Sequence, residues 1–300
     1  MTMPNFLIIG AAKAGTTSLY ASLKQHPQIY MTTVKEPNFF ALEGEKLDFP
    51  SGVPREGYRA NCKTSIESYC EQFQGVSNEI AIGEASPIYL YHPKAPERIQ
   101  HYVPHAKLIA ILRNPVERAY SNFLHHMREC CEPFTDFAQA LQQEENRIRN
   151  NWWWGFYYVS AGFYYIQLKR YFDKFDRSQI HVYLYEELHT NPVSLLRDIF
   201  KFLQVDETFI PNTSTKYNVS GIPKNQLFYN FLTQPNLIKE PFKRLLPSNL
   251  RQSIVLNLKN RSLIKPQLSS EVRSQLIQVY REDILKLQDL IERDLSQWLE

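Results

Sequence analysis

The segment "NFLIIGAAKAGTTSL" at residues 5–19 joins an apolar run to a turn rich in small and hydroxyl-bearing residues. Residues 5–10 read as a buried strand and residues 16–25 as a helix. A turn between a strand and a helix start binds anions, because the first backbone N–H groups of a helix have no intrahelical partner. The segment therefore predicts an anion site made of Lys13, Ala14, Gly15, Thr16, Thr17 and Ser18.

This loop differs from the phosphate loop of kinases and NTPases. The spacing from Gly10 to Gly15 matches that motif, but Thr16 stands where the motif has lysine, and Lys13 lies inside the loop. The apolar run 107–112 ends in Arg113, where an NTPase strand would supply an acid for Mg²⁺. A site with protein cations and no metal ion suits transfer of a sulfuryl group, because this group carries less negative charge than a phosphoryl group.

A second strand–turn–helix segment, "LRNPVERAYSNF", covers residues 112–123. Asn114 suits a helix N-cap, Pro115 suits the first helical position, and Glu117 would complete a capping box. Arg113 then lies at a helix N-terminus, with Ser121 about two turns along the helix. Arg113 and Ser121 are therefore predicted to form a second phosphate clamp, since a guanidinium binds phosphate in a bidentate manner.

The composition is that of an ordinary globular protein. The chain has 300 residues, 43% apolar and 22% charged, and a net charge of +3, which leaves room for one cationic pocket but does not suggest a nucleic-acid partner. No secretory signal or membrane-length apolar stretch is evident. The cysteines lack metal-binding C-x-x-C spacing, and we expect reduced thiols in a cytoplasmic protein.

Short apolar runs alternate with helical patterns, which predicts an α/β fold with a central parallel sheet flanked by helices. Strands are expected at 5–10, 28–31, 80–83, 107–112 and 180–185. Helices are expected at 16–25, 65–74, 94–103, 115–129, 134–149, 160–175, 192–203, 224–233, 241–259 and 269–298, with a loop at 40–63. We expect one domain over 1–300, with the motifs in 4–225 and a packed helical extension over 226–300.

Taken in order, "AAKAGTTSL", "KEPNFF", "LRNPVERAYSNF" and "YEEL" resemble the sulfotransferases that use 3′-phosphoadenosine 5′-phosphosulfate (PAPS). The branch that includes heparan sulfate sulfotransferases and bacterial relatives is the most similar. The resemblance implies a P-loop-like three-layer fold and a metal-free site, with adenosine 3′,5′-bisphosphate (PAP) as the nucleotide product. It assigns the 5′-phosphosulfate to the first loop and the 3′-phosphate to Arg113 and Ser121. It also implies nucleotide contacts from Gly221 and Lys224 in a basic loop that includes Lys216, while Tyr185 contacts the base or belongs to the core.

Glu36 precedes a proline, which disfavours helix and places it near the carboxyl edge of the sheet. By resemblance Glu36 is the general base and Lys13 assists catalysis; the alternative is a surface pair of Lys35 and Glu36. Glu84 ends another strand and competes for the role of base, with Ser86 as a pocket residue. Asn38 and Ala85 replace a histidine and a lysine found in some glycosaminoglycan enzymes, which weakens the prediction of a polyanionic acceptor.

The run "NNWWWGFYY" at 150–158 holds three consecutive tryptophans that cannot all face one core. Trp152, Trp153 and Trp154 either line an acceptor pocket or pack against a loop. The helix expected at 269–298 carries an apolar stripe that suits core packing, with a homodimer contact as the lesser alternative. The stripe comprises Val272, Leu276, Val279, Ile284, Leu287, Leu290 and Ile291.

These features favour a sulfotransferase that acts on a hydroxyl or amine of a small molecule. The alternatives are a glycan sulfotransferase, a P-loop kinase of small molecules and a non-catalytic nucleotide-binding protein. Arg113 and the displaced lysine count against the kinase, and Glu36 beside both anion sites counts against the non-catalytic protein.

Overall fold

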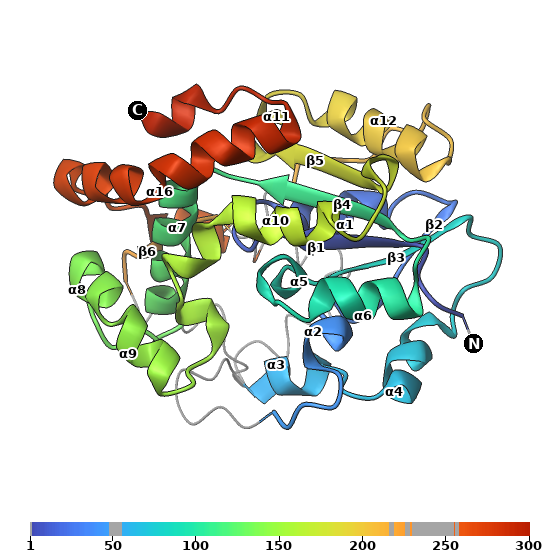
Figure 1. Ribbon diagram of the computed structural model, residues 1–300, viewed down its shortest axis with the longest axis horizontal. Helices are drawn as coiled ribbons and strands as arrows, with labels where there is room; N and C mark the ends of the chain where they lie inside the picture. The colour runs from blue at the N-terminus through green and yellow to red at the C-terminus, as the bar shows by residue number, and fades with distance from the viewer. Residues whose placement is uncertain (1, 48–55, 216–218, 226–228, 230–254, 256–257) are drawn as a thin grey trace.

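The computed structural model describes residues 2–47, 56–215, 219–225, 229, 255 and 258–300 (Figure 1). Lys216 and most of the helices expected at 224–233 and 241–259 lie outside these residues.

Five parallel strands form the central sheet in the order β2-β3-β1-β4-β5. The strands are β1 (Phe6–Gly10), β2 (Ile29–Met31), β3 (Ala81–Ala85), β4 (Lys107–Leu112) and β5 (Ile180–Leu184). All five expected strands are confirmed, with ends that differ by at most two residues. Since β3 and β4 flank β1 on opposite sides, the chain reverses its direction of travel across the sheet at β1, where open α/β sheets bind ligands.

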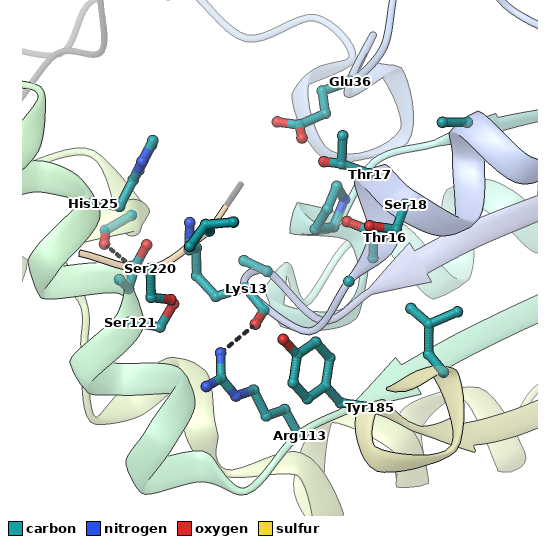
Figure 2. Close-up of a pocket in the computed structure, with 18 of the residues that line it drawn as sticks. Lys13, Thr16, Thr17, Ser18, Glu36, Arg113, Ser121, His125, Tyr185 and Ser220 are labelled. Carbon is teal, nitrogen blue, oxygen red and sulfur yellow. Dashed lines mark hydrogen bonds between the residues drawn. The ribbon is translucent and has the colours of Figure 1, made fainter. Parts of the chain in front are cut away.

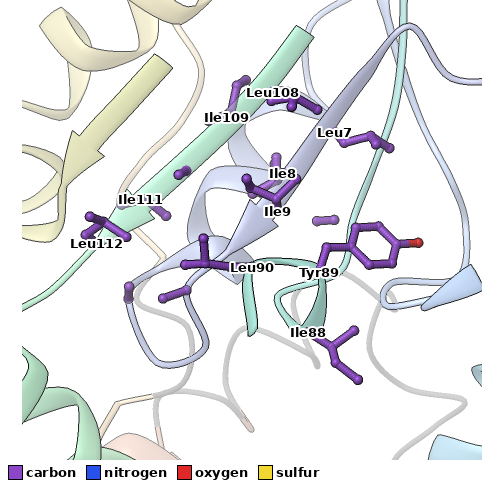
Figure 3. Close-up of a cluster of buried hydrophobic side chains, with 14 of the residues drawn as sticks. Leu7, Ile8, Ile9, Ile88, Tyr89, Leu90, Leu108, Ile109, Ile111 and Leu112 are labelled. Atoms are coloured by element: carbon purple, nitrogen blue, oxygen red, sulfur yellow. The ribbon is translucent and has the colours of Figure 1, made fainter. Parts of the chain in front are cut away.

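Helices pack on both sides of the sheet, as the three-layer prediction requires. In Figure 1, α10 crosses in front of the strands and α1 lies behind them. The apolar side chains of β1 and β4 are buried and meet Leu90 of the short helix α5 (Ile88–Tyr91), as Figure 3 shows. The helices that match expected segments are α1 (Thr16–Leu23), α4 (Ile66–Cys70), α6 (Ala95–Tyr102), α7 (Pro115–Arg128), α10 (Tyr164–Phe172), α12 (Pro192–Leu203) and α16 (Ser270–Ile291).

Several short elements differ from the sequence prediction. The helix expected at 134–149 is two helices, α8 (Phe137–Gln142) and α9 (Glu144–Arg149). The segment expected as a loop contains α2 (Phe39–Leu42) and α3 (Glu56–Asn61), and α11 (Tyr185–Thr190) follows β5 directly. Helices of four to six residues are too short to show a periodic pattern. An antiparallel pair, β6 (Ile222–Pro223) and β7 (Leu263–Ile264), also had no signal, because its strands are distant in sequence.

Helix α16 packs against α7 and α10. Leu276, Ile284, Leu287 and Ile291 of the expected stripe are buried, whereas Val279 is 49% exposed. Tyr280 replaces Val279 in the buried face, because it lies four residues from both Leu276 and Ile284. The helix ends at Ile291 instead of 298, where Glu292 adopts a left-handed conformation with φ 55°. The stripe therefore serves core packing.

Candidate active site

The loop between β1 and α1 opens onto a cavity of about 800 Å³. Gly15, at the helix N-cap, has φ 96°, and a Cβ there would approach Leu188 to 2.8 Å. Gly15 has no side chain, so the N-cap position supplies no side-chain acceptor for the first N–H groups of α1. Lys13 and the hydroxyl-bearing residues of the first turn line the cavity, while Ala14 is buried behind the loop. The lining residues of this first anion site are Lys13, Gly15, Thr16, Thr17 and Ser18.

Arg113 reaches the same cavity from the end of β4. Its Nη1 donates to the carbonyl oxygen of Lys13 at 3.2 Å, and its guanidinium lies 4.6 Å from the centre of the Tyr185 ring (Figure 2). Tyr185 lines the cavity and so belongs to the site. About two turns further along α7, Ser121 lies 2.5 Å from Ser220, oxygen to oxygen. The two anion sites expected from separate motifs are therefore brought together by neighbouring strands.

The Glu117 side chain does not complete the capping box expected from the sequence. Asn114 caps α7, since its side chain accepts from the N–H groups of Val116 and Glu117 at 2.9 and 3.3 Å. The Glu117 carboxylate, however, lies 3.5 Å from Arg113 and 3.0 Å from Lys265, and also pairs with Arg273. It serves as the counter-ion of a cationic cluster at the edge of the cavity, a role that the capping-box spacing did not reveal.

Two lining residues, Ser220 and Lys265, had no assignment from the sequence, and neither had Arg128, which lies beside the lining residue His125. Arg128, at the end of α7, donates from Nη1 to the carbonyl oxygen of Val219 at 2.8 Å, and its Nη2 lies 2.8 Å from His125 Nδ1. Ser121, His125 and Arg128 are spaced by four and three residues, so the helical period could have grouped them on one face. Ser220 and Lys265 carried no local signal, because they arrive beside the β6–β7 pair.

Lys13 is the electrostatic centre of this site. Withdrawal of its ammonium group from water, together with the positive charges of Arg128 and Arg113, lowers its pKa to about 7, although the Glu36 carboxylate acts in the opposite direction. Positive groups held together in this way gain from an anion bound between them.

Glu36 lines the same cavity as Lys13, but it comes from a different part of the chain, the segment after β2. Its backbone is left-handed, with φ 64°, and its N–H donates to the carbonyl oxygen of Ala85 at 3.1 Å. The carboxylate pairs with Lys35 and remains 36% exposed, so it is open to a molecule in the cavity (Figure 2). The pair of Lys35 and Glu36 exists, but it lies at the cavity and not on a distant surface.

Glu84 and Ser86 do not line the cavity, which departs from the expectation for both residues. Glu84 is fully buried and accepts hydrogen bonds from Ser86 at 2.8 Å, Tyr89 at 2.6 Å and Tyr69 at 3.3 Å. Burial raises the pKa of Glu84 to about 7. Ser86 in turn accepts from the N–H of Asn38 at 3.1 Å. Both side chains point into the core and support the segment that carries Glu36.

The tryptophan run divides between two environments. Trp153, which is 5% exposed, and Trp154 line the cavity, and Trp154 stacks on Tyr91 with ring centres 5.8 Å apart. Trp152 does not line it; its ring lies 5.2 Å from the Arg147 guanidinium and packs on Phe156. The backbone turns at Gly155, where a Cβ would come within 2.9 Å of Trp153, so adjacent tryptophans face different neighbours.

Gly221 and Lys224 also lie outside the cavity lining. Gly221 has φ 153°, and a Cβ there would approach the carbonyl oxygen of Ile264 to 2.6 Å. The N–H of Lys224 donates to the carbonyl oxygen of Ser262 at 2.8 Å. Both residues build the β6–β7 pair, and this pair presents their neighbours Val219 and Ser220 to the cavity.

Membrane-spanning helices and metal-binding clusters are both absent from the described residues. No described helix is long and apolar enough to cross a membrane. In the same part of the chain, no three His, Cys, Asp or Glu side chains gather in a way that could hold a metal ion. None of the four cysteines, all of which the structure describes, forms a disulfide bond.

Comparison with known proteins agrees with this geometry. A sulfotransferase from Alicyclobacillus acidocaldarius has a solved structure that is 33% identical, covers 100% of both chains and superposes with a TM-score of 0.79. The membrane-associated sulfotransferase kil1 of Dictyostelium discoideum is 35% identical over 41% of this chain and 23% of its own length. A bifunctional heparan sulfate N-deacetylase/N-sulfotransferase of Caenorhabditis elegans is 28% identical over 73% of this chain and 24% of its own. The chain thus spans about a quarter of the length of these two curated relatives. The model of the sulfotransferase family matches residues 4–209, and this chain belongs to that family.

Proposed function

We propose that this protein transfers a sulfuryl group from PAPS to a hydroxyl or amine of a small acceptor. The observation that carries the proposal is the presence of two anion sites on one cavity, one at Lys13 and the N-terminus of α1, the other at Arg113 and Ser121. A nucleotide with phosphates at both ends needs two such sites. The cytoplasm remains the proposed compartment, in keeping with four described cysteines that form no disulfide bond.

The residues present fit the donor. Lys13 and the hydroxyl groups of Thr16, Thr17 and Ser18 would hold its 5′ end, where the helix dipole also favours negative charge. Arg113 would hold the 3′-phosphate with Ser121. The Tyr185 ring, which supports the Arg113 guanidinium, is proposed to lie against the nucleotide. Gly221 and Lys224 are proposed to act on this site indirectly, by presenting Ser220.

The chemistry follows from the charges around the cavity. PAPS supplies an activated sulfuryl group when it is bound. Glu36 is proposed to take the proton from the acceptor hydroxyl or amine, since its carboxylate is accessible and lines the same cavity as Lys13. Lys13 would stabilise the negative charge that develops on the leaving phosphate oxygen.

Binding of PAP without added metal is the direct test of the donor site. An anion raises the pKa of Lys13 from about 7, so binding requires proton uptake above pH 7. We expect the affinity to fall roughly five-fold between pH 7 and pH 8. Calorimetry with EDTA present, in buffers of different ionisation enthalpy, measures both quantities. Loss of binding on chelation, or binding without proton uptake at pH 8, would contradict the proposed site.

A small acceptor is favoured over a polymer by the composition of the cavity. Trp153, Trp154, Phe156 and His126 form an aromatic wall of the cavity that Glu36 also lines. Such rings suit a planar or cationic acceptor through stacking and cation–π contact. The relatives named for heparan sulfate and carbohydrate sulfation make a glycan the competing acceptor.

Trp153→Ala and Trp154→Ala are expected to raise the Michaelis constant for the acceptor roughly two- to ten-fold, as aromatic contacts are worth about 0.5–1.5 kcal/mol. The dissociation constant of PAP should not change. Acceptors would be identified first by a screen with labelled PAPS. Trp152→Ala is the matched control, because that ring packs outside the cavity. Efficient sulfation of heparan-type polymers that is indifferent to the Trp153 and Trp154 substitutions would favour the glycan acceptor instead.

A further inference from the structure

His126 stands in the aromatic wall of the cavity with one ring nitrogen already engaged. It belongs to α7 and is half-buried, and its ring stacks on Phe156 with centres 4.1 Å apart. Its Nδ1 lies 3.0 Å from the hydroxyl oxygen of Tyr158. No hydrogen bond of its Nε2 to another described residue is found, and the ring lines the cavity. The open nitrogen is therefore the one available to a bound molecule.

A buried chain of hydrogen bonds stands behind Nδ1. The Tyr158 hydroxyl donates to Glu132 Oε2 at 2.6 Å. Glu132 Oε1 pairs with Arg147 Nη2 at 2.6 Å and accepts from the N–H of Phe134 at 3.2 Å. The side chains of Glu132 and Arg147 are 0% and 2% exposed. This series of hydrogen bonds therefore links His126 to an ion pair in the protein interior.

These hydrogen bonds determine which nitrogen of the His126 imidazole carries the proton. Both oxygens of the Glu132 carboxylate accept hydrogen bonds, Oε1 from Arg147 and Phe134 and Oε2 from the Tyr158 hydroxyl. The single proton of the Tyr158 hydroxyl is then committed to Glu132, so its oxygen accepts from His126. Nδ1 must carry the imidazole proton, which leaves a lone pair on Nε2.

The surroundings keep His126 neutral. Burial lowers its pKa to about 3, and the positive charges of Lys13, Arg147 and Arg118 act in the same direction. Burial together with the Glu132 carboxylate holds the pKa of Tyr158 well above its usual value, so that hydroxyl keeps its proton. At neutral pH, Nε2 is thus a hydrogen-bond acceptor within the electrostatic range of Lys13.

We propose that His126 binds the acceptor substrate, with Nε2 accepting a hydrogen bond from an O–H or N–H group of the acceptor. Tyr158 and Glu132 are positioning residues that hold the imidazole in the Nδ1–H tautomer. The site then selects acceptors that carry a hydrogen-bond donor at this point, over analogues in which that donor is methylated. This inference rests on the proposed function for its substrate, but the tautomer is independent of it.

The tautomer is tested first, by two-bond ¹H–¹⁵N spectra of the protein labelled with ¹⁵N-histidine. The His126 signals are assigned by their loss in His126→Gln, with the exposed His105→Gln as the control for the other histidines. We expect protonated Nδ1 and unprotonated Nε2 from pH 6 to pH 8, and loss of that preference in Tyr158→Phe. A protonated Nε2 in the unsubstituted protein overturns the proposal, whether or not the protein is active.

The acceptor contact is tested with the compound turned over fastest in the labelled-PAPS screen and with its O-methyl or N-methyl analogues. His126→Leu should raise the acceptor Michaelis constant roughly three- to ten-fold, the value of one hydrogen bond. The turnover number and the dissociation constant of PAP should stay the same, and His126→Gln, which keeps an acceptor oxygen, should restore the constant. An unchanged Michaelis constant in His126→Leu overturns the contact. Failure of the proposed function would show itself differently, as absence of PAP binding in the unsubstituted protein.

Discussion

Glu36→Gln is expected to lower the turnover number by about 10²–10⁴, the usual effect of removing a general base. The substitution keeps the shape of the side chain and removes the charge that takes the proton. Glu36 is not one of the residues proposed to hold the nucleotide, so the dissociation constant of PAP should change far less than the turnover number. Single-turnover sulfuryl transfer from labelled PAPS measures the first effect and calorimetry the second.

Two further variants make this prediction sharp. Glu282→Gln removes a carboxylate that is 82% exposed on α16 and should leave turnover intact. Glu84→Gln removes a fully buried carboxylate and should act on stability, through its hydrogen bonds with Tyr69 and Tyr89. If Glu36→Gln remains active while a folded Glu84→Gln does not, the base is Glu84 and the proposed role of Glu36 is wrong.

Arg113→Ala is expected to weaken PAP binding by about ten-fold to a hundred-fold, since each charge-assisted hydrogen bond is worth roughly 1.5–3 kcal/mol. The loss should be smaller for adenosine 5′-monophosphate, which lacks the 3′-phosphate. Glu117 keeps Lys265 and Arg273 as partners, so the removal of Arg113 does not leave a carboxylate without a counter-ion. Calorimetric titration with both nucleotides measures the difference.

Arg113→Lys separates charge from geometry. Lysine keeps the charge but not the bidentate fork, and we expect it to recover only part of the affinity. Arg177→Ala, at a guanidinium that is 54% exposed, serves as the matched control. Equal weakening for both nucleotides would assign Arg113 to another part of the ligand.

The sequence was most informative where one short segment holds a whole structural unit. The strand, turn and helix of residues 5–25 and of 107–129 each lie within a stretch where apolar runs, glycine and capping residues are read directly. The cap at Asn114 was predicted because it depends on neighbours two and three residues away. The carboxylate of Glu117 was not, because its partners Lys265 and Arg273 are distant in sequence.

Within the site, the sequence did not reveal which side chains point into the cavity. Glu36 follows β2 and Glu84 lies near the end of β3, at the same edge of the sheet, yet only Glu36 lines the cavity. Tyr69 of α4 and Tyr89 of α5 donate hydrogen bonds to the buried Glu84 carboxylate, and nothing in the sequence around Glu84 indicates this pairing. Trp152 and Trp153 separate for a similar reason, since the neighbours that receive each ring come from other elements.

By itself, therefore, the sequence determined the parallel sheet and the two strand–turn–helix segments that are proposed to bind anions, because these depend on short-range backbone geometry and on periodic burial. Only the tertiary structure decided that both turns share one cavity, that Ser220 and Lys265 line it, and that Glu84 does not. It also decided the hydrogen-bond chain from His126 to Glu132. The physical reason is that pKa values, tautomers and cavity linings arise from groups within a few ångströms in space, and packing brings such groups together from segments that carry no mark of one another.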